Sequence, residues 1–346
     1  MKRRDYLGLL GAGVFAAGAD FYSNRNVDEM DNPLGLSDKR LEEDDYWNVS
    51  VIPDTQNYSS NEEWMKHVKN QVEWIKDNRD DFNIVFAAHE GDLVSNGAEP
   101  IQWDRIESAL SSLDGELPFS VSPGNHDWNS TYDKASGIDE YRERFGGENF
   151  QENGWYDESG PYGLSHAQVF SSGEYDFLHL GLEWEPRDKT LEWADHKIDE
   201  YGFPTIVTTH SHLHKGVFGG NRMDEVKEEN GLGNHGDEVF EELIAPNSEV
   251  FMVFSGHSFG GLLPRDRGEY RQVSRNDSGE PVYEMLADFQ NRNEGGYGWM
   301  RNVTFLPGSG EEEDRISVST YSPSSGLNQV GDASDFSFEL DFEERF

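Results

Sequence analysis

Five short polar motifs recur along this sequence, and each contains residue types that bind divalent cations. In chain order they are Pro53-Asp54-Thr55-Gln56, Gly91-Asp92-Leu93-Val94, Gly124-Asn125-His126-Asp127, Thr209-His210 and Gly256-His257. Carboxylate and amide oxygens suit hard ions, whereas imidazole nitrogens suit Fe and Zn²⁺ as well. Any one of these motifs is common in proteins, but the five together predict a site for divalent metal ions.

A predicted strand precedes each motif. Apolar runs that favour buried strands cover 47–52, 82–88, 118–122, 203–209 and 250–255. Between the first three runs, apolar residues recur at helical spacing from Trp64 to Ile75 and from Trp103 to Leu113, which predicts two amphipathic helices. Alternating strands and helices predict an α/β protein with a sheet covered on its faces. In such proteins the ligand sites lie at the carboxyl ends of the strands.

The five motifs together resemble the calcineurin-like metallophosphoesterase superfamily, in the branch whose first motif is Asp-Thr-Gln and not Asp-x-His. The resemblance covers about Val51 to Pro323 and includes the stretch Gln290 to Arg301. It implies a four-layer α/β/β/α sandwich, two divalent metal ions and a small phosphomonoester or phosphodiester substrate. Two ions about 3.5–4 Å apart would neutralise the phosphoryl oxygens and deprotonate a bridging water, and this metal-bridged hydroxide would attack the phosphorus in line.

The same resemblance implies which residues bind the metals. Asp92 would bridge both ions with one carboxylate, and Asp54 and Gln56 would complete the first site. The implied protein ligands of the second ion are Asn125, His210 and His257. Because the carbonyl of an asparagine is neutral, the second site would keep a net positive charge for an anionic substrate.

His126 and Asp127 are the implied catalytic residues. His126 would stand beside the scissile phosphate and donate a hydrogen bond or a proton, while Asp127 would fix its tautomer. Three more polar residues could orient a ligand without binding a metal, namely Asn96, His89 and His212. If 209–214 continues as a strand, His210, His212 and His214 share one face, whereas a turn there leaves His210 alone at the site.

The last motif departs from the superfamily pattern Gly-His-x-His. Phe259 stands where the second histidine is expected and cannot bind a metal, and Gln56 replaces another imidazole. The first site would then have only oxygen donors, which favour Mn²⁺, Mg²⁺ or Ca²⁺, while the two imidazoles of the second site favour Mn²⁺, Fe or Zn²⁺. Either the first ion is loosely held or another group replaces the lost imidazoles.

The chain is strongly acidic. Its formal net charge is −40, yet 35% of its residues are hydrophobic and 13% are aromatic, which predicts a folded protein with a solvated acidic surface. Such a composition resembles that of halophile proteins, whose self-repulsion is screened over about 3 Å in molar salt. It disfavours bulk nucleic-acid binding. The absence of cysteine excludes disulfides, thiolate metal sites and a cysteine nucleophile.

The N-terminus predicts export. Arg3 and Arg4 precede a charge-free apolar stretch at 8–19, which resembles a twin-arginine signal peptide with a cleavage site at Ala17-Gly18-Ala19; a frayed helix is the alternative. The expected organisation is a signal peptide at 1–19, a linker or lead-in at 20–46, a metallophosphoesterase domain at 47–325 and a solvated acidic tail at 326–346. An extracellular or cell-surface location follows, with no transmembrane span in the mature chain.

Two other functions fit part of the sequence. The loss of two imidazoles is compatible with a degenerate, non-catalytic metal-binding surface protein, although the retained His126-Asp127 pair favours an enzyme. A glycosidase would need a pair of catalytic carboxylates, and no pair stands out among the 68 Asp and Glu residues. The segments 128–165 and 215–235 are the expected specificity loops.

Overall fold

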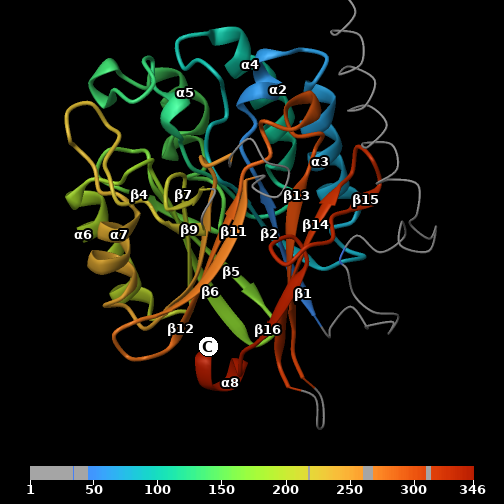
Figure 1. Cartoon of the computed structure of the whole chain (residues 1–346), viewed down its shortest axis with the longest axis vertical. Coiled ribbons are helices and arrows are strands. Elements are labelled where there is room, and N and C mark those ends of the chain that lie inside the picture. Colours follow the sequence, from blue (N-terminus) through green and yellow to red (C-terminus); the bar gives the residue numbers. More distant parts are fainter. Residues whose placement is uncertain (1–33, 35–45, 217–218, 260–267, 309–312) are drawn as a thin grey trace, which may run out of the picture.

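The computed structural model describes residues 34, 46–216, 219–259, 268–308 and 313–346 (Figure 1). The predicted signal peptide at 1–19 lies outside the described residues, as does the predicted lead-in at 20–46 except for Leu34 and Tyr46. These two side chains pack against Leu306 at the edge of the domain. Within the described ranges, no helix combines the length and apolar character that crossing a membrane requires.

The first of two seven-stranded sheets contains the first three predicted strands. Its order is β15-β14-β13-β1-β2-β3, with β16 paired to β14, and β1, β2 and β3 are parallel. Its strands are β1 (Trp47–Ile52), β2 (Ile84–His89), β3 (Phe119–Val121), β13 (Met300–Leu306), β14 (Arg315–Ser322), β15 (Leu327–Asn328) and β16 (Phe336–Glu339).

The second sheet has the order β11-β12-β10-β7-β6-β5-β4, in which β6, β7, β10 and β12 are parallel. Its strands are β4 (Tyr156–Ser159), β5 (His166–Ser172), β6 (Tyr175–Leu182), β7 (Thr205–Thr209), β10 (Val250–Ser255), β11 (Glu269–Arg275) and β12 (Pro281–Ala287). A separate hairpin joins β8 (Leu213–Gly216) to β9 (Gly219–Arg222).

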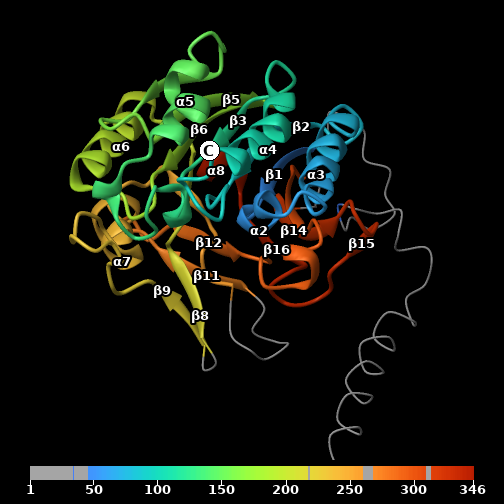
Figure 2. The same ribbon diagram turned by 90° about the horizontal axis from the view of Figure 1, so that it is seen from above.

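Helices cover the outer face of each sheet (Figures 1 and 2). Those on the first sheet are α2 (Gln56–Ser60), α3 (Met65–Asp77), α4 (Pro100–Leu110) and α5 (Asp139–Phe145). Those on the second sheet are α6 (Asp188–Tyr201) and α7 (Gly236–Val239). In α3, Met65, Val68, Val72 and Ile75 are buried at the spacing that the sequence predicts, because every third or fourth side chain faces the sheet.

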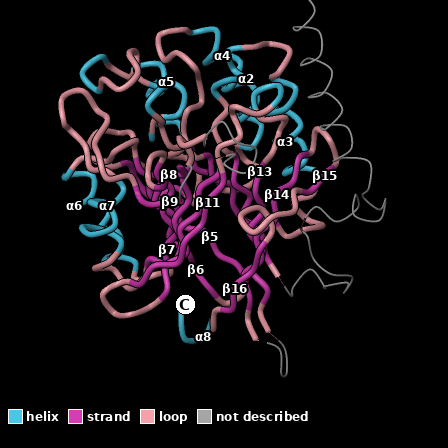
Figure 3. Tube along the Cα trace, in the orientation of Figure 1, coloured by secondary structure: helices cyan, strands magenta, loops and turns pink. Residues whose placement is uncertain are grey.

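Three apolar layers hold the fold together. One joins α3 and α4 to the first sheet, one fills the space between the sheets, and one joins α6 to the second sheet. Residues 86–88 of β2 show the alternation, since Phe86 and Ala88 face the other sheet while Ala87 faces the helices. The result is the predicted four-layer α/β/β/α sandwich, with the strands lying between two helical layers (Figure 3).

Two predictions about the C-terminal third are wrong. The apolar runs at 299–305 and 316–321 predict strands on the far side of a second sheet, but these strands, β13 and β14, extend the first sheet, because β13 pairs with β1. Residues 326–346 were expected to be a solvated tail, but β16 pairs with β14, and α8 (Phe342–Arg345) closes the lower end of the sheets in Figure 1. Apolar side chains from Phe336 to Phe342 alternate with polar ones, and this strand pattern is hidden by the acidic composition.

The segment 128–165, expected to be a specificity loop, is partly structural. It contains α5 and β4, and its Tyr141, Phe145 and Phe150 are buried in the core beside α4. Only its first part, around Tyr132, lies against a candidate ligand, as described below.

We expect Phe342→Ala to destabilise the domain by about 3–5 kcal/mol, the range for truncating a buried phenylalanine. Phe342 is 1% exposed and contacts Trp47, with ring centroids 5.7 Å apart. Urea unfolding followed by tryptophan fluorescence measures the change. Val330→Ala is the matched control, because Val330 is 61% exposed. Equal unfolding midpoints for the two variants would show that the C-terminal segment adds nothing to the core.

Candidate metal centre

Three predicted ligands of the second ion converge where the two sheets meet. Asn125 follows β3 of the first sheet, while His210 and His257 follow β7 and β10 of the second. Asn125 Oδ1 lies 3.1 Å from His210 Nε2 and 2.8 Å from His257 Nδ1, and the two imidazole nitrogens are 3.3 Å apart. Asp92 Oδ1 is 3.3 Å from His210 Nε2. Four potential donor atoms therefore surround one position.

The hydrogen bonds of His210 show that this position suits a cation. Its Nδ1 lies 2.9 Å from the carbonyl oxygen of Glu90 and must donate to it, which leaves a lone pair on Nε2 of the neutral ring. That lone pair faces Asn125 Oδ1 and Asp92 Oδ1, which are themselves acceptors. A proton on Nε2 would let His210 donate to only one of them, whereas a divalent ion would bind them all. The donor set therefore fits a metal ion.

Asp92 lies between this set and the predicted ligands of the first ion. While its Oδ1 faces His210, its Oδ2 accepts a 2.8 Å hydrogen bond from Gln56 Nε2. Asp54, next to Gln56 in the first motif, accepts from the backbone N–H of His257, at 3.2 Å to Oδ2. Burial, and then the nearby carboxylates of Asp288 and Asp92, raise the pKa of Asp54 well above its usual range. A cation here would relieve that repulsion.

The backbone is strained at two of these residues. Asp92 has φ 52° and His257 has φ 68°, in the left-handed region that non-glycine residues rarely adopt. Such residues cost about 1–3 kcal/mol each and cluster at functional sites. Gly124 is required for a related reason, since a Cβ there would lie 2.2 Å from Asp92 Oδ1 and 2.3 Å from Asp92 N. The chain is thus packed tightly around the carboxylate that both sets share.

His126 lies at the site, but its partner differs from the prediction. Its backbone N–H donates to Asp92 Oδ1 at 2.9 Å, and its Nδ1 lies 2.9 Å from the carbonyl oxygen of Ser95. Asp127 instead accepts from the backbone N–H groups of Val94 and Gly124, at 3.0 and 2.7 Å. The prediction that Asp127 fixes the tautomer of His126 is therefore wrong. The Ser95 carbonyl does so, and Asp127 joins two motif loops.

The three residues expected to orient ligands have different places. His89 contacts Thr55 Oγ1 through Nε2 at 3.0 Å, so it holds the residue between Asp54 and Gln56. Asn96 is exposed and accepts from Ala98 N, away from the ligands. His212 pairs with Glu284 at 2.8 Å, because the chain turns after β7 ends at Thr209. The structure thus supports an orienting position for His89 and not for Asn96 or His212.

Three buried residues at this edge were missed. Glu90 precedes the Gly91-Asp92 motif, and Asp288 and Gln290 follow β12 as the other ligands follow their strands. The signal that could have found the last two is a polar pair directly after an apolar strand. No local motif distinguishes them, and their position depends on which strand lies beside β12.

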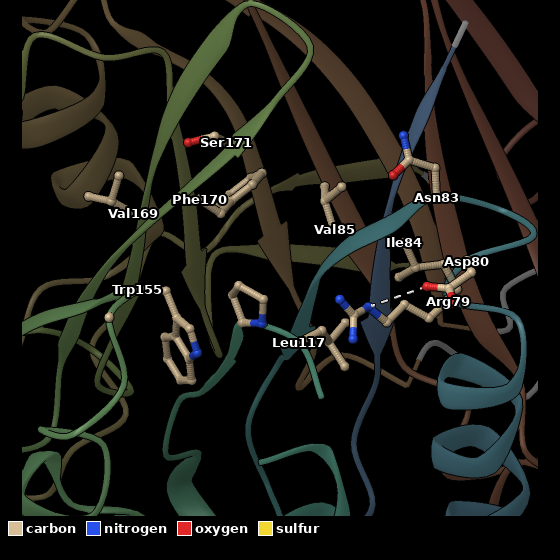
Figure 4. A pocket seen from close by; sticks show the side chains of 12 residues that line it. Arg79, Asp80, Asn83, Ile84, Val85, Leu117, Trp155, Val169, Phe170 and Ser171 are labelled. Carbon is tan, nitrogen blue, oxygen red and sulfur yellow. Dashed lines mark ion pairs between the residues drawn. The ribbon is translucent and has the colours of Figure 1, made fainter. Parts of the chain in front are cut away.

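A hollow of about 810 Å³ lies elsewhere (Figure 4). It is lined by the amino end of β2 at Val85, by Leu117 before β3, by Trp155, and by Phe170 of β5. None of the candidate metal ligands lines it, since those follow the opposite ends of the strands. This pocket is therefore separate from the candidate metal centre.

Comparisons with known proteins agree with this geometry. The family model described as calcineurin-like phosphoesterase matches residues 48–260. An uncharacterized Bacillus subtilis protein, YvnB, is 29% identical over 312 residues; these are 87% of this chain and 22% of that protein, so the chain spans about a fifth of its relative.

Solved structures are similar at lower identity. A purple acid phosphatase, PPD1, from yellow lupin seeds superimposes with a TM-score of 0.50 at 14% identity, covering 90% of this chain and 55% of that one. The Plasmodium protein GAP50, described as the anchor in the inner membrane complex, has a TM-score of 0.44 at 12% identity, covering 86% and 89%. The likeness to the lupin phosphatase concerns the fold alone.

We expect Asp92→Asn to weaken both metal sites and Asp54→Ala to weaken one, because only Asp92 faces both donor sets. A neutral amide bridges two cations poorly. Inductively coupled plasma mass spectrometry after dialysis against Mn²⁺ gives the stoichiometry, and Asn96→Ala serves as the control variant. If Asp92→Asn and Asp54→Ala removed the same single ion, the carboxylate of Asp92 would not be shared.

Proposed function

The chain belongs to the calcineurin-like phosphoesterase family, and we propose that it hydrolyses small phosphate esters at a centre of two metal ions. The convergence of Asn125 Oδ1, His210 Nε2, His257 Nδ1 and Asp92 Oδ1 carries this proposal, because four atoms that can each bind a metal ion lie close to one another. When bound, such ions supply positive charge to the phosphoryl oxygens and acidify water.

His126 is the residue that would act on the substrate. Its Nδ1 donates to Ser95, so its Nε2 accepts a proton in the neutral ring and donates one in the imidazolium. The ring is half-buried, and its backbone is tied to Asp92, which fixes it beside the metal centre. Its proposed role is to donate a hydrogen bond or proton to the phosphate group or to the leaving oxygen.

The neutral ligands adapt an acidic chain to an anionic substrate. Gln56 and Asn125 add no charge to the site, so two divalent ions would outweigh the two carboxylate ligands, Asp54 and Asp92. At the rim, Tyr132 is 37% exposed and stands edge-on to His257, with ring centroids 6.4 Å apart. An aromatic at this position would contact the alcohol portion of a bound ester.

The proposed substrate class is phosphomonoesters or phosphodiesters, and the proposed setting is outside the cell in high salt. Support for export comes from Arg3, Arg4 and the apolar stretch that follows, and support for salt comes from the net charge of −40. Export of the folded protein would let the centre load its metals before translocation.

We expect His126→Ala to lower kcat by about 10²–10⁴-fold, the usual loss when a general acid is removed. The substrate is a chromogenic bis-aryl phosphate with Mn²⁺ in molar salt. Metal content should be unchanged, because the side chain of His126 is not among the converging donors. Asn96→Ala, an exposed change in a neighbouring loop, should keep full activity.

Two outcomes would contradict this assignment. Metal loss in His126→Ala would make His126 a ligand. If the wild type turned over no phosphate ester with any divalent ion, the enzymatic function would be excluded in favour of a non-catalytic metal-binding protein.

Export has its own test. Residues 1–46 fused to a folded reporter should direct it through the twin-arginine pathway, and replacing Arg3 and Arg4 together by Lys should stop this. Lys2→Ala is the matched control, since it removes a charge outside the arginine pair. Unimpaired export of the double-lysine variant would show that another route or no twin-arginine signal operates.

A further inference from the structure

We propose that Gln290 binds the first metal ion through its side-chain carbonyl oxygen and that Asp288 positions it. Gln290 would thus replace the imidazole that is lost where Phe259 interrupts the last motif. The inference rests on the proposed two-metal function but concerns only the composition of the first site.

The topology of the second sheet brings Gln290 to the right edge. The strands β10 and β12 are parallel neighbours, and Ser255 pairs with Leu286. The residues that follow β12 therefore emerge beside Gly256 and His257, which follow β10. Phe259 itself is 45% exposed, so its side chain does not fill the vacated position.

Gln290 contacts the predicted ligands of the first ion directly. Its Oε1 accepts a 2.5 Å hydrogen bond from Gln56 Nε2, which also donates to Asp92 Oδ2 at 2.8 Å. Its Nε2 lies 3.5 Å from Asp54 Oδ2. Its amide thus touches Gln56 and Asp54 and lies one hydrogen bond from Asp92, and it is 8% exposed.

Asp288 determines which end of this amide faces the site. Its Oδ1 accepts from Gln290 N and its Oδ2 accepts from Gln290 Nε2, both at 3.0 Å. The amide nitrogen is therefore held by Asp288, and the carbonyl oxygen is turned towards Gln56. Carboxylates that anchor the far end of a metal ligand in this way raise its affinity.

A separate observation suits a cation at this edge. Glu90 Oε2 is buried and has no hydrogen-bond partner within the described part of the chain. Glu90 and Asp54 flank Gly256, where an added Cβ would lie 3.5 Å from Glu90 Cβ and 2.1 Å from Asp54 Oδ1. A buried carboxylate oxygen without a donor is costly unless a cation compensates it.

Arg301 supplies only part of that charge. The positive charge of Arg301 lowers the pKa of Glu90, against the larger effect of burial. The guanidinium itself contacts other groups, because its Nη2 donates to the carbonyl oxygen of Ala333 at 2.8 Å and lies 3.7 Å from Glu269. Meanwhile Asp54, Glu90, Asp92 and Asp288 are each at most 3% exposed. Burial raises the pKa values of three of these groups, Asp54, Glu90 and Asp288, and a bound cation would stabilise their ionised forms.

The resulting site is built of oxygen atoms from Asp54, Asp92, Gln56 and Gln290. A half-turn of its side-chain amide exchanges the oxygen and nitrogen of Gln56, so its carbonyl can face an ion when one binds. Without imidazole, such a site prefers Mn²⁺, Mg²⁺ or Ca²⁺ to Zn²⁺. The imidazole-containing second site has no such preference for hard ions, and the two sites should differ in selectivity.

Mn²⁺ titration of the full chain, followed by electron paramagnetic resonance and calorimetry, tests this assignment. In Gln290→Ala and in Asp288→Asn, one Mn²⁺ site should weaken by about 10–100-fold and the other should be unchanged. Gln71→Ala is the matched control, because Gln71 is also a buried glutamine. It lies in α3, and its Nε2 donates to the carbonyl oxygen of Trp299 at 3.0 Å. That variant should keep both affinities.

Two further variants separate a metal ligand from a structural residue. Gln290→Glu keeps an oxygen at the site and adds charge, so it should tighten Mn²⁺ binding. Gln290→His should shift the competition between Mn²⁺ and Zn²⁺ towards Zn²⁺ at the same site. If Gln290 were purely structural, Gln290→His would leave the competition between Mn²⁺ and Zn²⁺ unchanged, and this variant also decides the question if Gln290→Ala does not fold.

The outcomes for the wild type and the variants are distinguishable. If the wild type binds two Mn²⁺ ions and every Gln290 and Asp288 variant keeps both affinities, the role of Gln290 is refuted while the two-metal function stands. If the wild type binds fewer than two ions, the two-metal function fails and this inference fails with it.

Discussion

The carboxylate of Asp92 is the element on which the rest of the site depends. One oxygen faces His210 and the other faces Gln56, so two donor sets from two sheets share a single side chain. Holding it there requires a left-handed backbone at Asp92 and a neighbour, Gly124, with no room for a Cβ. The backbone strain at Asp92 persists because an apolar layer between the two sheets stabilises their packing.

Charge is the second constraint, since a chain of net charge −40 buries carboxylates at the edge where it would bind an anion. Two neutral amides separate these carboxylates, with Gln56 between Asp92 and Gln290, and Gln290 next to Asp288. Amide donors reduce the repulsion when no ion is bound, and amide oxygens can serve as ligands when one is. Metal binding and stability of this edge are therefore coupled, because the ions would bind the folded arrangement alone.

The opposite end of the sandwich is closed by different means. There, α8 packs its Phe342 and Phe346 against aromatic residues of both sheets, including Phe305 and Phe251. This aromatic cluster keeps the sheets in register at one end, and the donor residues require that register at the other. An acidic C-terminal segment is thus part of the core and not an appendage.

The sequence alone predicted much of the fold and the residues of the candidate centre. Asp54, Gln56, Asp92, Asn125 and His257 are expected there because each lies in a motif that resembles the family's, directly after an apolar strand, and both signals are local. The four-layer sandwich followed from the family that these motifs resemble, and the family model confirms it. The prediction that the first site has only oxygen donors also follows from residue types, since Gln56 and Phe259 stand where imidazoles are expected.

Only the tertiary structure decided the remaining contacts. His210 lies at the candidate metal centre and His212 does not, because β7 ends at Thr209. The hydrogen bond between His126 and Ser95 depends on two loops that meet in space. Asp288 and Gln290 join the site because β12 lies beside β10, and β16 belongs to the core because it pairs with β14. Strand pairing joins residues far apart in the chain, and no local periodicity specifies which strands become neighbours.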